Sequence, residues 1–571
     1  MADDEVKQVF LDIRNGHSSK NGSPKKAVDG GAVRSPSKLP EVLACCSALS
    51  FHFGLGLVLA YSAVLLPQLE APDSDIKISR EQASLVASIV ALSVPIGSLV
   101  TGPIMEALGR IRTVQLASVP YIVGSVLIAT ATGFPMLLAG RFLTGIASGT
   151  FGANPAIVYT TEVARPELRG SLISIGPFMV SLGTFVTYIV GAYMHWRTLA
   201  WVFAGAPLIT LGLMLLCTPE SPLWLAAKGR REKALKSVKF LARKDPAKLA
   251  SAEADVDALV LAAEERRASQ RSGLAAFLAT LFMQRTGLRP LVVVATLFAL
   301  QQFCGMYVTL FFAVSFFKDV GSAMDPNLAS ILVGAIRVVT SVQATFMMRR
   351  FGRRPLLLLS ASCCALAMAV SGYFARIIAN GPADGPVALN ATLPEDAEAL
   401  AAAAWVRWVP VVAILVYVYC GMLGLLTIPW TMTAEMFAPR VRSLGQGISV
   451  ALANVFMFGA VQSYKDLVGL LGGVWAVHWL YAAVALIAVV FVYLFVPETH
   501  RRTLAEIEEY FDTSLVYPLY QRRRRQQRLG LEQGGLVVNR ADSPTGHNES
   551  GVAANGANGH GASAALLDEK A

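Results

Sequence analysis

Long stretches without a single Asp, Glu, Lys or Arg constrain the fold of this chain more than any other feature. They are residues 84–104, 113–140, 171–193, 199–217, 355–375, 408–434 and 443–464. A helix needs about 20 apolar residues to cross the roughly 30 Å hydrocarbon core of a bilayer. The chain is 54% hydrophobic and only 15% charged, whereas soluble domains carry about a quarter charged residues. We therefore expect an integral membrane protein, which excludes a cytosolic enzyme, a nucleic-acid-binding protein and a secreted disulfide-rich domain.

The apolar stretches predict an all-α fold with about twelve transmembrane helices in two halves of six. The expected spans of the first half are residues 43–67, 84–104, 113–131, 135–159, 171–193 and 198–217. Those of the second half are residues 290–317, 327–348, 355–378, 405–434, 443–464 and 470–496. The expected domains are a disordered tail at 1–40, the first half at 41–217, a helical linker at 218–288, the second half at 289–511 and a disordered tail at 512–571.

The charged residues are divided unequally between the two sides of the expected membrane. Basic residues gather on one side, at residues 110–112, 165–169, 229–288, 349–354 and 440–442. Acidic residues gather on the other side, in the loops 68–80 and 379–402. Because basic loops stay in the cytoplasm, we expect a multi-pass plasma-membrane protein with both termini cytoplasmic. The net charge of +10 then results from the basic residues on the cytoplasmic side. We expect a lipid bilayer as partner and no nucleic acid. Asn390, in an Asn-Ala-Thr sequence of an outside loop, is the expected glycosylation site.

Several residues recur at matching places in the two halves. The recurring sets are Glu162-x6-Arg169 and Glu435-x6-Arg442, Gly109-Arg110 and Gly352-Arg353, and Pro219-Glu220-Ser221 and Pro497-Glu498-Thr499. The glutamate and arginine of the first set both recur at an offset of 273 residues. A parallel repeat of two membrane halves predicts a central path between halves that rock against each other.

Further short motifs lie along the membrane part of the chain, from about residue 43 to residue 511. They include Gly140-Arg141-Phe142, Pro219-Glu220-Ser221-Pro222-Leu223-Trp224-Leu225, Gln301-Gln302-Phe303-Cys304-Gly305, Gly352-Arg353-Arg354, Pro429-Trp430 and Pro497-Glu498-Thr499. In combination with the repeat, these motifs resemble the sugar porter family of the major facilitator superfamily. The resemblance implies the major facilitator fold. Pro177 stands where hexose carriers usually have a glutamine, so the chain is similar to the facilitated trehalose transporter branch.

Six charged residues at the cytoplasmic ends of the expected spans form a candidate gate. They are Arg110, Glu162, Arg169, Arg353, Glu435 and Arg442. A network of ion pairs at these ends can latch the two halves and break when the cytoplasmic side opens. The alternative is that these charges only fix topology and complete helix ends. Two departures from the family affect the gate, since Glu106 replaces an aspartate and Arg349 reverses the charge of the corresponding position in the second half.

Two glutamines and a tryptophan are the candidate substrate site. Gln301 and Gln302 lie in an otherwise apolar span, where polar amides are costly unless they pair or line a cavity. The resemblance implies that they bind sugar hydroxyls, and that Trp430 stacks under the sugar ring. Trp430 follows Pro429 in a Gly-rich span that can bend. The alternatives are hydrogen bonds between helices for the glutamines and a packing or interfacial role for the tryptophan.

Other positions of the expected site depart from the family pattern. Tyr307 occupies the position of an asparagine, and Phe311 and Phe312 replace a tyrosine pair. In the eleventh span, Ala453 occupies the slot of an asparagine and Asn454 the slot of the tryptophan after it. Tyr307 and Asn454 are therefore candidate substrate contacts, and the usual mode of hexose binding is not expected.

Arg337 is the one formal charge expected in the middle of a span. A charge at mid-bilayer costs at least about 2.5–3.5 kcal/mol, so its side chain should face the interior or water and have a partner. We expect it to face the cavity, where it would hydrogen-bond hydroxyls or attract an anionic solute. The alternative is a structural arginine bound to backbone carbonyls at a helix end.

The expected function is that of a facilitative, alternating-access transporter of a hexose or a trehalose-like disaccharide, as the resemblance implies. Two alternatives stay open: a carrier of another small solute such as an organic anion, and a non-transporting sugar receptor or sensor. The first span contains no acidic residue and only His52 as a titratable candidate, which favours facilitated diffusion. The sequence shows no nucleophile motif and no metal-ligand spacing. We therefore expect no enzyme activity, no cofactor and no metal, and a monomeric protein.

Overall fold

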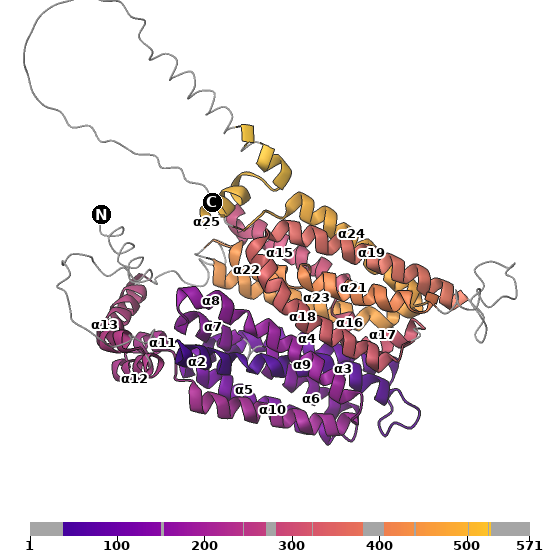
Figure 1. Ribbon diagram of the computed structural model, residues 1–571, viewed down its shortest axis with the longest axis horizontal. Coiled ribbons are helices and arrows are strands. Elements are labelled where there is room, and N and C mark those ends of the chain that lie inside the picture. The colour runs from indigo at the N-terminus through magenta and orange to yellow at the C-terminus, as the bar shows by residue number, and fades with distance from the viewer. Residues whose placement is uncertain are drawn as a thin grey trace, which may run out of the picture. The chain divides into compact units, whose positions relative to one another are not determined.

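The protein is a bundle of long helices in two sets, one before and one after the linker (Figure 1). The computed structural model describes residues 38–149, 154–243, 245–269, 281–321, 324–380, 405–438, 441–500, 502–522 and 525–526. Within these ranges there are helices and no strand. Eleven of the described helical segments are long and apolar enough to cross a membrane. The expected all-α membrane fold is therefore confirmed.

The first set begins with a span made of two consecutive helices, α2 and α3, which together cover Leu39–Leu69. The helices of this set are α2 (Leu39–Leu49), α3 (Phe51–Leu69), α4 (Arg80–Leu108), α5 (Arg110–Ala129), α6 (Phe134–Ile146), α7 (Asn154–Val163), α8 (Pro166–Ile173), α9 (Ile175–Gly191) and α10 (Trp196–Cys217). The span expected at 135–159 corresponds to α6 and α7. Because residues 150–153 lie outside the described ranges, this span is not among the eleven.

The second set repeats this arrangement after the linker. Its helices are α15 (Arg285–Phe303), α16 (Val308–Phe311), α17 (Ala313–Asp319), α18 (Pro326–Arg350), α19 (Arg353–Asn380), α21 (Val409–Leu423), α22 (Ile428–Glu435), α23 (Arg442–Leu470) and α24 (Val474–Phe495). The expected glycosylation site, Asn390, lies outside the described residues.

Two spans of the second set are interrupted near their middle. Between α15 and α16, Gly305 has a φ of +91°, and a Cβ there would lie 2.4 Å from the ring of Tyr481. Glycine is the residue that adopts this conformation without strain. The span expected at 290–317 therefore consists of α15, α16 and α17. Between α21 and α22 the helix breaks at Gly424, as the glycines and the proline of this span predict.

Two helices of the first set, α3 and α9, cross at glycines. A Cβ on Gly56 would lie 2.1 Å from the carbonyl oxygen of Val180, and one on Gly183 would lie 2.2 Å from the carbonyl oxygen of Phe53. Small residues allow such close approach of backbones in membranes. The crossing therefore joins α3 and α9 more closely than larger side chains would permit.

The two sets meet most extensively along two pairs of helices, and α3 also packs against α16 and α17. α4 packs against α23, and α9 packs against α18. At the second contact Gly334 of α18 lies against the backbone of α9, because a Cβ there would be 2.9 Å from the Cα of Phe185. The path expected between the halves is thus bounded by α4, α9, α18 and α23.

The linker contains three helices, α11 (Pro222–Ala227), α12 (Arg231–Ala242) and α13 (Pro246–Ser269). Its small core consists of Trp224, Leu225, Ala234 and Val256. Arg165 fastens the linker to the first set, since its Nε donates to Glu41 Oε2 and its Nη2 donates to Asp245 Oδ2, both at 2.9 Å. All three side chains are largely buried, so the linker, the start of α2 and the α7–α8 connection are held together.

After α24 the chain returns to the bundle in α25 (Leu504–Thr513). Arg289 of α15 donates from Nη1 to the carbonyl oxygen of Phe511 at 2.7 Å. This compact unit extends to Tyr517, and a second unit follows in which residues 518–522 are helical. The domain boundaries expected from the sequence stay predictions.

The glycine crossing generates the first testable prediction. Gly183→Val should lower the free energy of unfolding by about 1–3 kcal/mol, because overpacking forces the α3 and α9 backbones apart. Gly212→Val in α10 is the matched control, since a Cβ there meets nothing within 4 Å. The measurement is the thermal unfolding of both purified variants in detergent. Equal melting temperatures for the two variants would show that the crossing does not depend on glycine.

Candidate functional site

The first candidate residue, Gln301, connects the two interrupted spans. It lies near the end of α15, fully buried. Its Nε2 donates to the carbonyl oxygens of Leu425 at 2.7 Å and Leu426 at 2.9 Å. These carbonyls lie in the break between α21 and α22, where helical hydrogen bonds are missing. Gln301 therefore serves the structural role that the alternative interpretation gave it, a hydrogen bond between helices.

Gln302, the next residue, has a different environment. Its Nε2 donates to Gln301 Oε1 at 3.2 Å. Its Oε1 is buried and has no hydrogen-bond partner among the described residues. An unpaired polar atom in a buried position costs on the order of 1–3 kcal/mol. Gln302 thus presents an acceptor that a ligand hydroxyl can satisfy.

Arg337 lies in α18 and is only 6% exposed, so its side chain lies inside the protein rather than against lipid. Its Nε is buried without a hydrogen-bond partner within the described part of the chain. The hydroxyl-bearing rings of Tyr188 and Tyr307 are close enough to interact with its charge. Arg337 is therefore a buried cation whose Nε is an unpaired donor.

Aromatic side chains surround this part of the bundle. Trp430, in α22, is half-buried and packs edge-on against Phe298 of α15, with ring centroids 5.0 Å apart. Its side chain also lies close enough to the hydroxyl of Tyr307 to interact with it. Tyr307 therefore lies close to both Trp430 and Arg337, and the three residues form one group. Asn454 is buried in α23, and its Nδ2 donates to Val450 in its own helix at 2.8 Å, which does not connect it to this group.

Tyr188 is a member of the neighbourhood that the sequence analysis missed. It comes from α9 in the first half, and its hydroxyl donates to the carbonyl oxygen of Leu310 in the second half at 2.8 Å. The sequence signal was the polar series Thr184, Thr187 and Tyr188 in a span without charges. With Tyr188 included, the candidate site contains residues from both halves.

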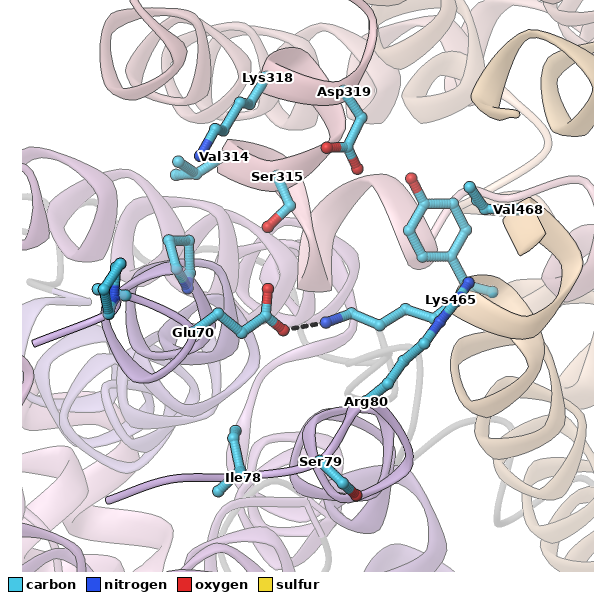
Figure 2. A pocket seen from close by; sticks show the side chains of 14 residues that line it. Glu70, Ile78, Ser79, Arg80, Val314, Ser315, Lys318, Asp319, Lys465 and Val468 are labelled. Atoms are coloured by element: carbon cyan, nitrogen blue, oxygen red, sulfur yellow. Dashed lines mark hydrogen bonds and ion pairs between the residues drawn. The ribbon is translucent and has the colours of Figure 1, made fainter. Parts of the chain in front are cut away.

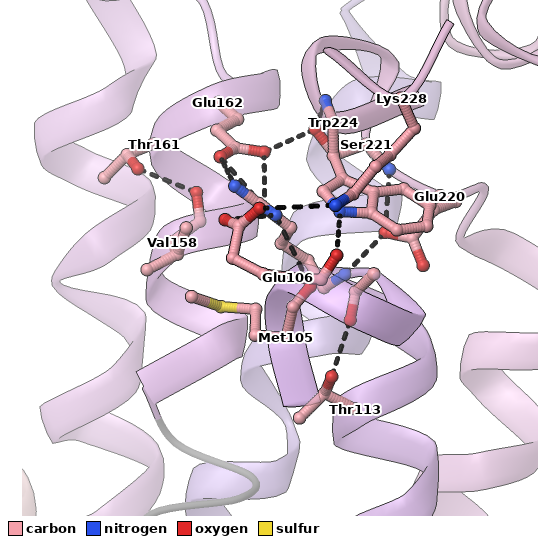
Figure 3. A network of polar contacts seen from close by, with 12 residues as sticks. Met105, Glu106, Thr113, Val158, Thr161, Glu162, Glu220, Ser221, Trp224 and Lys228 are labelled. Carbon is pink, nitrogen blue, oxygen red and sulfur yellow. Dashed lines mark hydrogen bonds and ion pairs between the residues drawn. The ribbon is translucent and has the colours of Figure 1, made fainter. Parts of the chain in front are cut away.

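At the end of the bundle that carries the basic loops, the first-half gate residues form a network (Figure 3). Arg110 donates from Nη2 to Glu162 Oε1 at 2.9 Å and from Nη1 to Glu106 at 3.2 Å. The hydroxyl of Ser221 donates to Glu162 from the other side. Glu220 accepts the backbone N–H groups of Arg110 and the following residues at the start of α5, the first at 2.8 Å. The network therefore ties α4, α5, α7 and the linker together.

The second half contains the corresponding network. Arg353 donates from Nη2 to Glu435 Oε1 at 3.0 Å, and the hydroxyl of Thr499 donates to Glu435 Oε2 at 2.5 Å. Glu498 accepts the backbone N–H of Arg353 at 2.9 Å at the start of α19. A feature without a counterpart in the first half is His500, whose ring Nδ1 lies 2.6 Å from Arg353 Nη1. The sequence repeat thus corresponds to a repeat of contacts.

Two of the six gate residues, Arg169 and Arg442, make a different contact. Each donates to the carbonyl oxygen five residues before it, Arg169 to Ala164 at 3.2 Å and Arg442 to Phe437 at 3.4 Å. The described ion pairs of the gate residues, Arg110 with Glu162 and Arg353 with Glu435, each lie within one half. A contact between the halves at this end comes from Arg349, whose Nη2 donates to the hydroxyl of Ser171 at 2.9 Å.

At the opposite end, polar residues of both halves line a cavity of about 580 Å³ (Figure 2). Glu70, at the end of α3, pairs with Lys465 of α23 across the interface. Nearby, the hydroxyl of Ser88 in α4 donates to Gln462 Oε1 of α23 at 2.7 Å. Arg80, Lys318 and Asp319 also line the cavity. The structure therefore joins the halves at the end that carries the acidic 68–80 loop.

The described residues contain no group of three or more His, Cys, Asp or Glu side chains that could hold a metal ion. All seven cysteines are described, and none forms a disulfide. Cys45, Cys304 and Cys364 are buried, where a free cysteine packs as a small apolar residue.

Comparisons with known proteins agree with this architecture. The sequence model of the family described as "Sugar (and other) transporter" matches residues 32–511. The facilitated trehalose transporter Tret1 of Drosophila yakuba is 31% identical over 493 residues, which cover 86% of this chain and 54% of that protein. The Tret1-2 homolog of Drosophila sechellia is 31% identical over 469 residues, which cover 82% of this chain and 90% of that protein. The chain thus spans about half the length of the first relative and most of the second.

Solved structures show the same fold. The xylose transporter XylE from E. coli in a partially occluded inward open conformation superimposes with a TM-score of 0.62 at 19% identity, over 82% of this chain and 99% of that one. XylE bound to 6-bromo-6-deoxy-D-glucose, described as a major facilitator superfamily proton:xylose symporter, gives a TM-score of 0.60 at 21% identity, over 83% and 99%. The fold is therefore the major facilitator fold, and the chain belongs to the sugar transporter family.

Proposed function

We propose that the protein carries a sugar across the membrane by facilitated diffusion and alternating access. The observation that supports this most is the pair of unsatisfied buried polar atoms, Gln302 Oε1 and Arg337 Nε. Gln302 Oε1 is an acceptor and Arg337 Nε is a donor, and both lie in the second half. Tyr188 of the first half reaches this half through its hydrogen bond to Leu310. A ligand rich in hydroxyl groups can satisfy both types of atom, because each hydroxyl donates and accepts.

The proposed substrate is a hexose or a trehalose-like disaccharide. Trp430 and Tyr307 supply the aromatic surface against which the C–H face of a sugar ring can pack. The relatives named as trehalose transporters support a disaccharide. We place Gln302, Tyr307, Arg337 and Trp430 in direct contact with the substrate. Gln301 positions the site through the α21–α22 break, and Asn454 stays a candidate contact from α23.

The proposed cycle uses the contacts at the two ends of the bundle. The end that carries the basic loops faces the cytoplasm of the cell, with both termini, in a plasma membrane. At the opposite end, which we place outside the cell, the Glu70–Lys465 pair and the Tyr188–Leu310 hydrogen bond join the two halves. The clamps of Arg110 with Glu162 and of Arg353 with Glu435 hold each half rigid at the inner end. We propose that Arg169 and Arg442 complete these clamps by holding the loops that follow α7 and α22.

Facilitated diffusion is supported by the first span. Residues 42–69 contain no Asp or Glu, and Glu41, at the start of the span, is paired with Arg165. The span therefore offers no unpaired carboxylate that could carry a coupling proton. His52 is buried, its Nδ1 lies 3.2 Å from the carbonyl oxygen of Leu49, and its ring lies against Gly176 of α9. These contacts give His52 a packing role.

The second candidate function is transport of an organic anion, and Arg337 favours it. The described ion pairs of the bundle do not include this buried cation. A carboxylate on a substrate would compensate its charge, and breaking such a buried pair is costly. The two candidates therefore differ in what Arg337 recognises.

Uptake measurements with Arg337→Gln distinguish them. For a sugar carrier, wild-type protein in proteoliposomes should take up labelled trehalose or glucose and no member of an organic-anion panel. Arg337→Gln should then reduce sugar uptake about tenfold, because a hydrogen bond from a charged group contributes about 1.5–3 kcal/mol. A protonophore should leave the initial rate unchanged.

Three other outcomes of this experiment would contradict the proposal. Anion uptake that disappears in Arg337→Gln would assign the protein to the second candidate function. Sugar binding without uptake of any solute would indicate a receptor or sensor. Uptake that collapses with the protonophore would show proton coupling.

The neighbouring glutamines allow a test that separates binding from folding. Gln302→Leu should weaken sugar binding about tenfold and lower the melting temperature less than Gln301→Leu does, since it removes an acceptor that has no partner and a single hydrogen bond to Gln301 Oε1. Gln301→Leu should lower the melting temperature, because it leaves the Leu425 and Leu426 carbonyls without donors in a water-free region. Sugar binding by equilibrium dialysis and thermal unfolding in detergent measure the two effects. A Gln302→Leu variant that binds as wild type would remove Gln302 from the site.

The clamp at the cytoplasmic end predicts a kinetic effect. Glu162→Gln should lower the maximal uptake rate about tenfold with little change in KM, because a largely buried partner of Arg110 loses its charge. Glu106→Gln is the matched control, since Glu106 contacts the same arginine but its side chain is 60% exposed. An exposed ion pair contributes only about 0–1 kcal/mol, so the control should change the rate by less than about fivefold. Equal effects of both substitutions would refute the clamp.

A further inference from the structure

A separate cavity lies outside the bundle interior, where the linker meets the start of α5. It has a volume of about 180 Å³. Its walls come from the first turn of α5, the segment around α11 and one face of α12. The charged and aromatic residues that line it are Arg112, Glu220, Trp224, Arg230, Lys233 and Lys236. Four of these six side chains carry a positive charge.

The four basic side chains are not neutralised by the surrounding protein. Arg112, Arg230, Lys233 and Lys236 take part in none of the ion pairs or side-chain hydrogen bonds to carboxylates among the described residues. Arg230 lies over the ring of Trp224, 5.5 Å from its centroid. All four are exposed at the mouth of the cavity. The cavity is therefore a concentration of positive charge that is open to a ligand.

The single acidic residue in the wall does not offset this charge. The carboxylate of Glu220 accepts the backbone N–H groups of Arg110 at 2.8 Å, Ile111 at 3.1 Å and Arg112 at 3.3 Å. It is thus committed to the positive end of helix α5. Its acceptor positions point toward backbone donors rather than toward the basic side chains.

The sequence of α12 keeps the basic side chains on one face. Lys233 and Lys236 are three residues apart, so they are neighbours on the helix surface. Ala234 points the other way, into the linker core with Val256. Like charges at this spacing repel each other, and an anion between them would remove the repulsion. Arg112 comes from α5, so such an anion would also bridge a transmembrane helix to the linker.

We propose that this cavity binds a polyvalent phosphate group, presented by the headgroup of an anionic lipid of the inner leaflet. Arg112 lies at the start of a transmembrane helix, at the depth of the lipid headgroups when the basic loops face the cytoplasm. Basic pockets at this depth on the cytoplasmic side bind phosphorylated headgroups. Two arginines can each hold a phosphate with two hydrogen bonds, and two lysines add point charges. A bound headgroup would fasten α12 to α5, two residues from the Arg110 clamp.

The test uses full-length protein in detergent, with native mass spectrometry to count and rank bound ligands. The probes are dioctanoyl phosphatidylinositol 4,5-bisphosphate and free inositol 1,4,5-trisphosphate. The test variant is the double substitution Lys233→Gln with Lys236→Gln. The matched control is Lys239→Gln with Arg243→Gln, which removes the same charge from the same helix and its end but away from the cavity. The basic run at residues 522–525 is identical in every variant.

We expect wild type and the control to bind one lipid that the test variant binds about 25-fold more weakly. Each basic side chain near an anionic surface contributes roughly a factor of five. Tighter binding of the lipid than of the free trisphosphate supports the lipid source, and equal binding supports the same phosphate site with a soluble ligand. Binding of neither probe, binding by the test variant equal to wild type, or equal losses in both double variants would overturn the proposal. Far-UV circular dichroism of each variant confirms that it is folded.

Discussion

The hydrogen bonds from Gln301 to the carbonyl oxygens of Leu425 and Leu426 make the centre of this protein possible. In a hydrocarbon environment no water is available to satisfy a backbone group, so a transmembrane helix can break only where other groups supply the missing bonds. The buried amide of Gln301 performs this role for the break between α21 and α22, together with the hydroxyl of Ser360, which accepts the backbone N–H of Leu425 and donates to the carbonyl oxygen of Cys420. The break in turn frees α22 to carry Trp430 at an angle of its own, close to Tyr307 and Phe298. The candidate site therefore depends on an interaction that does not itself contact a substrate.

The need to satisfy backbone groups also explains the two clamps at the end of the bundle that carries the basic loops. A helix begins with backbone N–H groups that have no partner within the helix. Glu220 and Glu498 satisfy these groups at the starts of α5 and α19, and the residue after each glutamate, Ser221 or Thr499, donates to the buried glutamate of the clamp. The Pro-Glu-Ser sequence of the first half and the Pro-Glu-Thr sequence of the second thus each satisfy the start of a helix and position an ion pair. Its duplication gives both halves the same rigid inner end, on which a rocking motion of whole halves depends.

The sequence predicted the all-α membrane fold and which charged residues recur in the two halves, because both depend on local patterns of charge and apolarity. It did not predict the break after Phe303, since the positive φ of Gly305 is fixed by the Tyr481 ring of a distant helix. Tyr188 was missed because its partner is a backbone carbonyl, which no side-chain pattern reveals. The latch between halves was expected from the charges alone, yet the described pairs lie within each half. The sequence repeat shows which residues correspond in the two halves. It does not show whether a residue pairs within its own half or across the interface between the halves.

The glycine crossing of α3 and α9 has a consequence for leakage through the protein. The Glu70–Lys465 pair lies at the end of α3, and the Tyr188–Leu310 hydrogen bond comes from α9. Because Gly56 and Gly183 bring the two backbones into contact, neither helix can tilt outward without the other. In the proposed cycle these two contacts then break in a single event, whose cost is the sum of both rather than the smaller of the two. Partly open states that would admit water or small ions are thereby made rare, even though each contact by itself is weak.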